Sequence, residues 1–360
     1  MRLGRITTDA VRGFAALLVV FLHLSSLIVP QQIWIEKTYP VAFLLPWLFR
    51  SEVAVGVFIF LSGFLLTLSR IEKAENWAVF FIRRVLRIYP VYIPLLIVAI
   101  SISRQWDFHG FINAILLLPN FPGTLWPYPY LSTAWSLGVE WTLYLFFPFL
   151  VFLLRFNFKA LLLMMMIIQI AIIYGVIIGS DLHTLVYGSI LGRSLQFMLG
   201  IVCAFHYQKA SRWFFEHKIV FFALTYIPVH LWTLWYLNAG GATSNSALRL
   251  LQPYIESIFC IVLLLLFHLL IDVHGKALWV RPLRFVGAIS FPLYLTHVIV
   301  VDLVMKTFQK QGFIVPHFTL VLQMFSIVTL SIGLAWLIHE AIEKPTASWV
   351  RTRYGELRQH

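Results

Sequence analysis

The first apolar segment of this 360-residue chain carries three side chains that could do chemistry: Asp9, Arg12 and His23. Arg12 and His23 are 11 residues apart. On a helix that is three turns plus about 20°, so both project from one face, about 16 Å apart along the axis. Asp9 lies one turn before Arg12 and could pair with it. The spacing predicts a polar stripe leading into a membrane span, although a histidine bonded to a neighbouring carbonyl explains His23 equally well.

A second basic group, Arg83, Arg84 and Arg87, comes at the start of another apolar segment. Arg84 and Arg87 share a helix face at i, i+3. Guanidinium groups bind phosphate through paired, charge-assisted hydrogen bonds, so these side chains could hold a phosphorylated ligand. A topological explanation competes with that one, because basic residues gather at the cytoplasmic ends of membrane spans and near anionic lipid.

Three more ionisable residues, Glu140, Arg193 and His297, fall inside apolar segments, where a charge costs about 2.5 kcal/mol or more on insertion scales. Glu140 and Arg193 lie at similar predicted depths, which predicts a buried pair that organises the bundle without chemistry. His297 lies deep in its segment and could reach the depth of His23, with Pro292 indicating a kink or a local break. A histidine that bridges two helices is the alternative interpretation of His297.

Composition determines the class of protein that positions these groups. The chain is 60% hydrophobic and 12% charged, with a mean hydropathy of +0.86, whereas soluble domains carry about 25% charged residues. This excludes an ordinary soluble fold and predicts an all-α, polytopic transmembrane bundle. About ten segments are predicted to span: 12–30, 51–69, 85–102, 134–154, 160–179, 185–206, 218–238, 254–273, 284–305 and 317–339.

The basic residues also predict an orientation. With a cytoplasmic N-terminus, ten spans place 19 of the 27 Lys and Arg in cytoplasmic segments and 6 in outer ones, as the positive-inside rule requires. Both termini are then cytoplasmic, and the net charge of +12 reflects topology and membrane lipid instead of nucleic acid. We expect one membrane domain, residues 1–345, then a basic cytoplasmic tail, 346–360, and a first span that is retained, not cleaved as a signal.

Cysteine and histidine spacing indicates neither a disulfide framework nor a metal site. The two cysteines, Cys203 and Cys260, both lie in apolar runs and form no CxxC pair. The histidines do not fall at the tight spacing of metal ligands. We therefore expect chemistry that needs no metal.

Six stretches, taken in order, resemble the membrane-bound acyltransferase family 3, whose members O-acylate sugars and other acceptors with acyl-coenzyme A. The stretches are "TDAVRGFAALLVVFLH", "VGVFIFLSGFLLT" around Ser62, "RRVLRIYP", "WSLGVEWTLYLFFP" and, more loosely, "RSLQFMLG" and "SFPLYLTH". Their order and spacing cover nearly the whole chain. One position departs from the pattern: Gly56 stands where many members carry an acidic residue. If that acid orients the histidine, Asp9 is one candidate to replace it.

The resemblance implies a transferase that uses acyl-coenzyme A, with acetyl-coenzyme A the expected donor. Its phosphates would be held at the inner face by basic residues, namely Arg12, Arg83, Arg84 and Arg87. The thioester would arrive near His23, which acts either as general base on an acceptor hydroxyl or as the carrier of an acyl-histidine intermediate. Asp9 and Glu140 are expected to assist catalysis. Residues expected to contact the acceptor are Trp135, Arg193, Tyr294 and His297.

The acceptor that the resemblance implies is a cell-surface polysaccharide, or its lipid-linked precursor, at the outer side of a bacterial cytoplasmic membrane. The aromatic stretch "FPGTLWPYPY" at 121–130 could form its entrance, and an interfacial aromatic belt explains that stretch equally well. Two hypotheses compete with the enzyme. A glycan transporter also has many spans with buried charges, but no inverted repeat is evident here. A non-catalytic subunit of a glycan-export complex predicts that His23 is dispensable.

Overall fold

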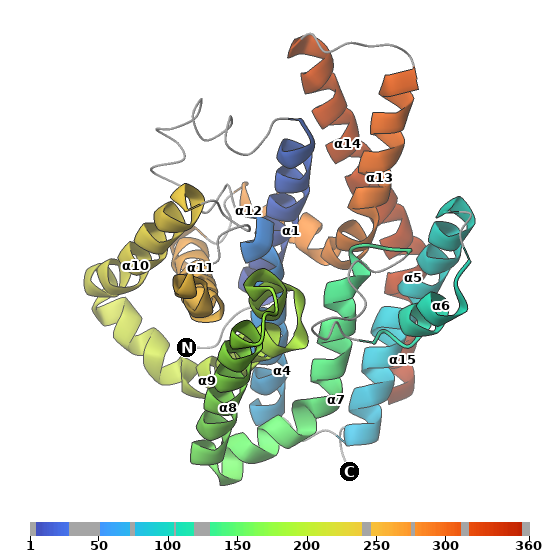
Figure 1. The fold of residues 1–360 in the computed structure, drawn as a ribbon. Coiled ribbons are helices and arrows are strands. Elements are labelled where there is room, and N and C mark those ends of the chain that lie inside the picture. The colour runs from blue at the N-terminus through green and yellow to red at the C-terminus, as the bar shows by residue number, and fades with distance from the viewer. Residues whose placement is uncertain are drawn as a thin grey trace.

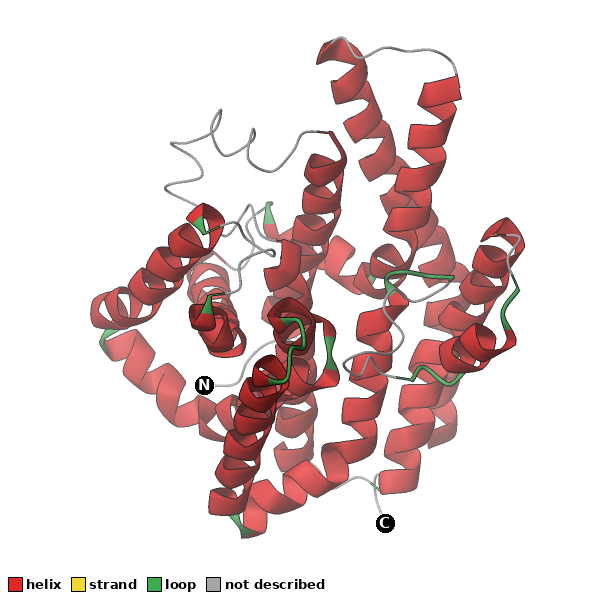
Figure 2. Cartoon of the chain, in the orientation of Figure 1, coloured by secondary structure: helices red, strands yellow, loops and turns green. Residues whose placement is uncertain are grey.

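The regular elements of the protein are helices wherever its structure is described (Figures 1 and 2). The computed structural model describes residues 5–28, 51–72, 76–103, 106–118, 130–239, 246–274, 278–310 and 317–354. The elements are α1 (Arg5–Ile28), α4 (Ser51–Glu72), α5 (Trp77–Ser103), α6 (Phe108–Ile115), α7 (Ala134–Phe156), α8 (Phe158–Ile177), the π-helical η2 (Thr184–Gly188), α9 (Ile190–Glu216), α10 (Lys218–Asn238), the 3-10 helix η4 (Ala247–Leu251), α11 (Gln252–His274), α12 (Val280–Ala288), α13 (Ser290–Lys310), α14 (His317–Ile338), the π-helical η5 (His339–Glu343) and α15 (Lys344–Tyr354).

The predicted all-α membrane bundle is confirmed. In the described ranges eight helices are long and apolar enough to cross a membrane, and they coincide with eight of the ten predicted spans. The other two predicted spans correspond to α1 and to α10, whose apolar part, Val220–Tyr236, is shorter. The apolar stretch at 111–123, which is shorter than the about 20 residues that a helical span needs, contains the end of α6, and its residues from 119 onward lie outside the described ranges.

Helices α1 and α4 lie near the middle of the bundle (Figure 1). Helix α1 contacts α4, α11, α12, α13 and α14, and α4 also contacts α7, α9 and α11. The other helices surround this pair, with α10 and α11 on one side and α5, α13 and α14 on the other. The central position of α1 and α4 explains how their polar residues can meet side chains from several distant segments.

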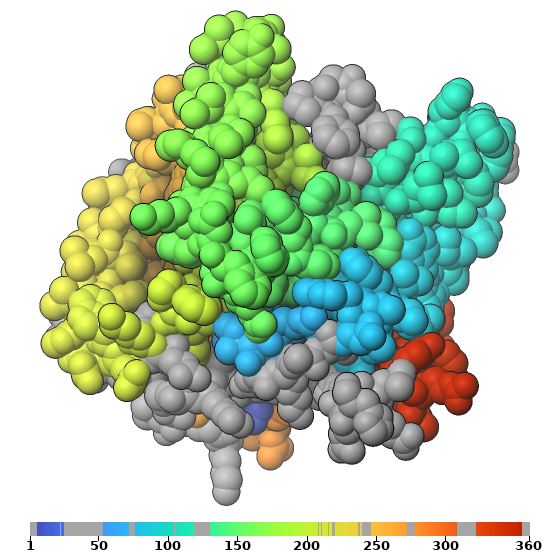
Figure 3. Space-filling view, turned by 90° about the horizontal axis from the view of Figure 1, so that it is seen from below, coloured from blue at the N-terminus to red at the C-terminus, as the bar shows by residue number. Residues whose placement is uncertain are grey.

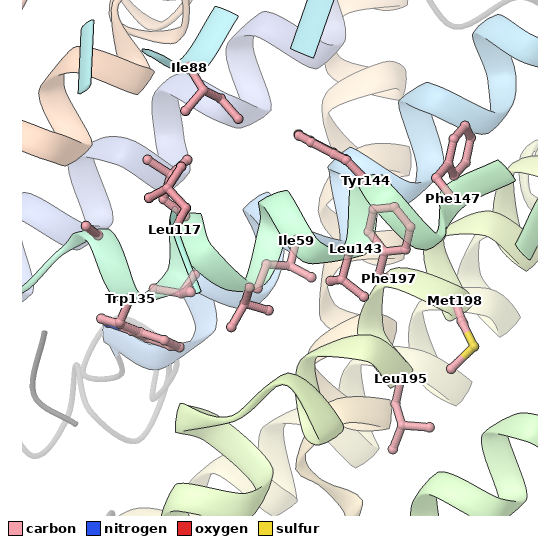
Figure 4. Close-up of a cluster of buried hydrophobic side chains, with 14 of the residues drawn as sticks. Ile59, Ile88, Leu117, Trp135, Leu143, Tyr144, Phe147, Leu195, Phe197 and Met198 are labelled. Carbon is pink, nitrogen blue, oxygen red and sulfur yellow. The ribbon is translucent and has the colours of Figure 1, made fainter. Parts of the chain in front are cut away.

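Glycines allow the central helices to approach their neighbours closely. A Cβ at Gly63 of α4 would overlap the backbone carbonyl of Phe197 in α9, and a Cβ at Gly200 of α9 would overlap that of Phe60 in α4. Small residues at such contacts are the common means of tight helix packing in membranes. Aromatic side chains fill the adjacent space, where Tyr144 and Phe147 of α7 contact Phe197 (Figure 4).

Two predicted spans are each broken into two elements. The segment predicted at 185–206 begins with the π-helical η2 and bends at Ser189, whose backbone is extended (φ −107°, ψ 164°) before α9 starts. The segment predicted at 284–305 consists of α12, a break at Ile289 and then α13. Pro292 lies in the first turn of α13, where its missing N–H disrupts no bond within that helix.

Helix α5 begins earlier than predicted, and part of the predicted tail is helical. Because α5 starts at Trp77, Arg84 and Arg87 lie about 10 and 15 Å along it by helix rise and not at its entrance. Helix α15 covers residues 344–354 and lies beside α5 at the lower face of the molecule (Figure 3). There Arg83 Nη2 donates to the carbonyl of Tyr354 at 2.9 Å.

Candidate active site

Polar residues from five helices line a cavity of about 110 Å³ inside the bundle. The lining carries three guanidinium groups, from Arg12 of α1 and from Arg84 and Arg87 of α5. The polar residues that complete the lining are Ser62, Ser136, Glu140, Tyr144, Ser290 and Tyr294. The structure therefore brings together Arg12, Arg84 and Arg87, which the sequence placed on two separate segments.

Glu140 supplies the carboxylate of this cavity. Its Oε1 accepts hydrogen bonds from the hydroxyls of Ser62 and Tyr144, and the two hydroxyls are themselves 3.3 Å apart. The guanidinium of Arg84 lies 5.6 Å from the centre of the Tyr144 ring, within the range of a cation–π contact. Glu140 is thus held in one orientation by α4 and by its own helix, α7.

The lining of the cavity carries three guanidinium groups and one carboxylate, that of Glu140. Asp9 and Glu343 lie close enough to Arg12 to interact with its charge, so Arg12 has acidic neighbours on α1 and η5. Glu343 in turn bonds His339 Nδ1 at 2.7 Å. Arg84 and Arg87 share one face of α5, whereas the adjacent Arg83 bonds Tyr354 and does not line the cavity. An anionic ligand with several oxygens would match this set of donors.

Two histidines lie side by side on α1 and α13. The ring centroids of His23 and His297 are 5.0 Å apart and the rings are tilted by 65°. The prediction that His297 reaches the depth of His23 is confirmed. His23 Nδ1 is 3.0 Å from the carbonyl of Val19, and His297 Nδ1 is 2.8 Å from that of Tyr294. Because a carbonyl only accepts, each Nδ1 carries the hydrogen in the neutral ring and each Nε2 carries the lone pair.

Tyr294 connects the cavity with the histidine pair. Its side chain lines the cavity and its hydroxyl is 2.7 Å from that of Ser136 on α7. Its ring centroid is 5.9 Å from that of His297, and its backbone carbonyl bonds the same histidine. Ser290, Tyr294 and His297 lie on one face of α13, so by helix rise His297 lies about 4.5 Å beyond Tyr294 and about 10.5 Å beyond Ser290, the two polar residues of α13 that line the cavity.

The predicted Glu140–Arg193 pair is wrong. Arg193 is fully buried and pairs instead with Glu256 of α11, at 3.1 Å from Nη1 to Oε2. Its Nε donates to the carbonyl of Tyr187, at the end of η2. Similar depth on two helices does not fix which way their side chains point, and Glu140 points toward the cavity while Arg193 points toward α11. Glu256 was missed, although Gln252 and Glu256 form a polar i, i+4 pair within an apolar run.

Trp135 lies with Arg193 and outside the cavity. The Trp135 ring is 5.1 Å from the ring of Tyr187 and 5.9 Å from the Arg193 guanidinium, measured to ring centroids. Of the residues expected to contact the acceptor, Tyr294 and His297 therefore lie together and Trp135 and Arg193 form a separate group. Most of the aromatic stretch at 121–130 lies outside the described residues, and Tyr130, which is described, bonds the backbone of Asp107.

The space beside Gly56 is filled by another acid. A Cβ at Gly56 would lie 2.6 Å from Glu256 Oε2 and 2.8 Å from Gln196 Nε2. The carboxylate next to this part of α4 therefore comes from α11. Asp9 does not replace such an acid in orienting His23: α1 is one continuous helix, which separates the two residues by about 21 Å. Near Asp9 lies Arg12, the first residue of the predicted stripe.

Comparison with known proteins places the chain among transferases. A family model described as an acyltransferase domain matches residues 6–340. A curated protein of Acidianus two-tailed virus, named "Putative acetyltransferase ORF330", is 27% identical over 301 residues, which cover 81% of this chain and 82% of the viral protein. No solved structure matches the chain significantly.

Proposed function

Since the chain belongs to the acyltransferase 3 family and is an integral membrane acyltransferase, we propose that it moves an acyl group from acyl-coenzyme A to a hydroxyl of a cell-surface polysaccharide or its lipid-linked precursor. We propose acetyl as that group because the viral relative is named an acetyltransferase. We further propose a bacterial cytoplasmic membrane as its location, with both termini cytoplasmic. The distribution of Lys and Arg along the sequence supports that orientation.

The observation that carries this proposal is one cavity with three guanidinium groups, connected through Tyr294 to a pair of histidines. Coenzyme A is a polyphosphate at one end and a thioester at the other. Arg12, Arg84 and Arg87 offer the charge-assisted donors that phosphate oxygens require. The histidines lie farther along α1 and α13, in the direction that an extended arm would take from that cavity.

In the proposed reaction His23 is the general base. Its Nε2 takes the proton of the acceptor hydroxyl while the hydroxyl oxygen attacks the thioester carbonyl. The C–O bond forms, the C–S bond breaks, and the thiolate of coenzyme A leaves and takes up a proton. Val19 helps by holding Nδ1–H, which keeps the lone pair on Nε2. Glu140 is held in place by Ser62 and Tyr144. Its negative charge offsets part of the positive charge of the three arginines, which weakens the binding of coenzyme A enough for it to be released.

The test uses purified protein in nanodiscs, as wild type and as His23→Ala. Consumption of acetyl-coenzyme A is followed with a panel of surface glycans, and donor binding is measured by calorimetry. We expect turnover by the wild type and a fall in kcat of about 100-fold or more in His23→Ala, the contribution usual for a general base, with donor binding retained. If radiolabelled acetyl stays on the protein when no acceptor is present, direct transfer is replaced by an acyl-histidine intermediate.

Two further variants test the donor cavity. Arg87→Gln removes one guanidinium, and we expect donor binding about tenfold weaker or more, since a hydrogen bond to a charged group contributes about 1.5–3 kcal/mol. Arg351→Gln removes the same charge from the exposed surface of α15 and should leave binding unchanged. A wild type that neither binds nor consumes any acyl-coenzyme A would contradict the donor model and favour a transporter. Full turnover by His23→Ala would exclude His23 as the base.

A further inference from the structure

We propose that the N-terminus of α13, together with the hydroxyl of Ser290, binds the diphosphate of acyl-coenzyme A from the side of the cavity that carries no arginine of α5. The proposal rests on the proposed function, because it identifies which further groups hold the same donor. It gives Ser290 a role in binding that the sequence did not predict.

The first argument is that the Ser290 hydroxyl is buried without a hydrogen-bond partner among the described residues. Ser290 is 1% exposed, its Oγ bonds no other described group, and the residue lines the cavity. A hydroxyl in a helix can donate to the carbonyl one turn earlier, as Thr296 of the same helix does to Pro292 at 2.8 Å. A buried polar atom that lacks such a bond has lost its interaction with water and gained nothing in return. A ligand in the cavity would supply the partner.

The second argument is that the first turn of α13 offers backbone donors at the same place. Helix α13 starts at Ser290, and both Ser290 and Phe291 line the cavity. The first N–H groups of a helix have no carbonyl partner within it. Pro292 has no N–H, and Leu293 N donates to the carbonyl of Ile289 at 3.0 Å, so Ser290 and Phe291 carry the donors of this helix end. Ile289 has no polar side chain that could cap them. Such helix ends bind anions.

The third argument is the charge around the cavity. A helix N-terminus carries a partial positive charge of about half an elementary charge. Here it adds to the guanidinium groups of Arg12, Arg84 and Arg87, against the one carboxylate of the described lining, that of Glu140. Arg84 Nε is a second buried donor that bonds no described group. Positive groups repel one another strongly where water is excluded, so an anion with more than one charge would stabilise this arrangement.

Helix packing brings Arg12 and the start of α13 together. A Cβ at Gly13 of α1 would overlap the carbonyl of Leu283 in α12, and a Cβ at Gly287 of α12 would overlap the carbonyl of Asp9 in α1. The backbones of α1 and α12 are therefore in direct contact, and α13 starts three residues after Gly287. The guanidinium of Arg12 and the N-terminus of α13 belong to one cavity because of this contact.

The position of Ser290 along α13 favours the diphosphate over the other phosphate of coenzyme A. The diphosphate is joined to the pantetheine arm, whereas the 3′-phosphate is on the ribose. By helix rise α13 leads from Ser290 to His297 over about 10.5 Å. A group held at Ser290 whose attached arm extends to the histidines is therefore the diphosphate. Two phosphoryl groups also offer enough oxygens to meet α13 on one side and the arginines on the other.

The test compares wild type with Ser290→Ala in nanodiscs, with coenzyme A and inorganic pyrophosphate as the probes for calorimetry. We expect Ser290→Ala to bind both about tenfold more weakly, because it loses a hydrogen bond to a charged group. Without ligand its Tm should be unchanged or slightly higher, since the hydroxyl that it removes bonds no described group. Ser290→Thr keeps the hydroxyl and should restore binding.

The matched control is Ser331→Ala in α14. Ser331 is also fully buried, its Oγ also bonds no described group, and it does not line the cavity. This variant should bind both probes as the wild type does. Ser290→Gly, which also removes the hydroxyl, serves as the second variant if Ser290→Ala does not fold.

Dephospho-coenzyme A, which keeps the diphosphate and lacks the 3′-phosphate, identifies the group that Ser290 meets. An equal loss of affinity for coenzyme A and dephospho-coenzyme A supports the diphosphate, and a loss for coenzyme A alone would overturn that assignment. Wild-type affinity in Ser290→Ala, or a lower Tm of its ligand-free form, would overturn the role of Ser290 and leave the proposed function intact. A wild type that binds neither coenzyme A nor pyrophosphate would contradict the proposed donor, and this site with it.

Discussion

At the scale of single residues, the polar groups inside this bundle form two sets, one around the buried carboxylate of Glu256 and one around the cavity. In the set around Arg193, the carboxylate of Glu256 accepts from Arg193, from Gln196 at 2.6 Å and from Gln252 at 2.8 Å. All four side chains are buried. Such a network joins α9 to α11 and suits a structural role. The arginines of the cavity face open space instead, which suits a ligand.

The buried network gives a prediction about stability. Glu256→Gln leaves the Arg193 guanidinium buried without its carboxylate, and breaking one partner of a buried pair costs about 3–5 kcal/mol. We expect a clearly lower Tm in detergent. Asp302→Asn is the matched control, because it makes the same change in the exposed Asp302–Lys306 pair of α13, where screening by solvent leaves little to lose. Equal Tm values for the two variants would refute a structural role for Glu256.

The sequence predicted some residue contacts and not others for a physical reason. His23 and His297 were expected at one depth in the membrane, because the rise per residue converts the sequence distance from a helix end into a depth. The structure agrees, since their ring centroids are 5.0 Å apart. The partner of Arg193 depended on rotation about the helix axis and on which helices are neighbours. Neither follows from depth, so Glu140 was chosen and Glu256 was missed. Likewise, Glu140, Arg12 and Arg87 share a cavity that no spacing along the chain reveals.

At the scale of helices, close backbone contacts fix how the site is assembled. Gly63 follows Ser62 directly, so the α4–α9 contact sets the position of the hydroxyl that bonds Glu140. Gly13 follows Arg12, and a Cβ there would overlap the backbone of Leu283 in α12. In both cases the residue that lines the cavity is the neighbour of a glycine at a helix crossing. Packing and site geometry are therefore coupled.

Gly63→Ala tests this coupling. The added methyl overlaps the Phe197 carbonyl, so α4 and α9 must separate, and overpacking of this kind costs about 1–3 kcal/mol. We expect a lower Tm together with a lower kcat, since Ser62 moves with the helix. In the control, Gly333→Ala in α14, the methyl meets no atom of the described residues within 4 Å, and the change should be neutral or stabilising by up to about 1 kcal/mol. A Gly63→Ala protein as stable and active as that control would disprove the close contact.

Helix existence was predictable from apolar length, because a membrane span needs a long run without charges. The breaks were harder to predict. Ser189 and Ile289 interrupt segments that are predominantly apolar in sequence. Composition gives no sign of the extended backbone at Ser189. The early start of α5 was missed because arginines suggested a boundary, although arginine is a good helix former and here continues the helix into the cavity.

At the scale of the whole molecule, the distribution of charge predicts one orientation in the membrane. Helices α7 and α8 meet at Asn157, next to Arg155 and Lys159, and α8 ends near Gly179 and Ser180, where no Lys or Arg is close in sequence. The positive-inside rule predicts that the first junction lies in the cytoplasm and the second outside. Since α8 alone separates them, the two positions test the orientation of a single span and, through the alternation of spans, of the chain.

Cysteine labelling in intact cells distinguishes the two orientations. In a Cys203→Ala, Cys260→Ala background, Lys159→Cys and Ser180→Cys each offer one thiol at an end of α8, where Lys159 is exposed and Ser180 is partly exposed. We expect a membrane-impermeant maleimide to label Ser180→Cys in intact cells and Lys159→Cys only after permeabilisation. The reverse pattern would place the side of the bundle that carries Arg12, Arg84 and Arg87 outside the cell. The arginines would then lie away from cytosolic coenzyme A, and the proposed donor would have to be abandoned.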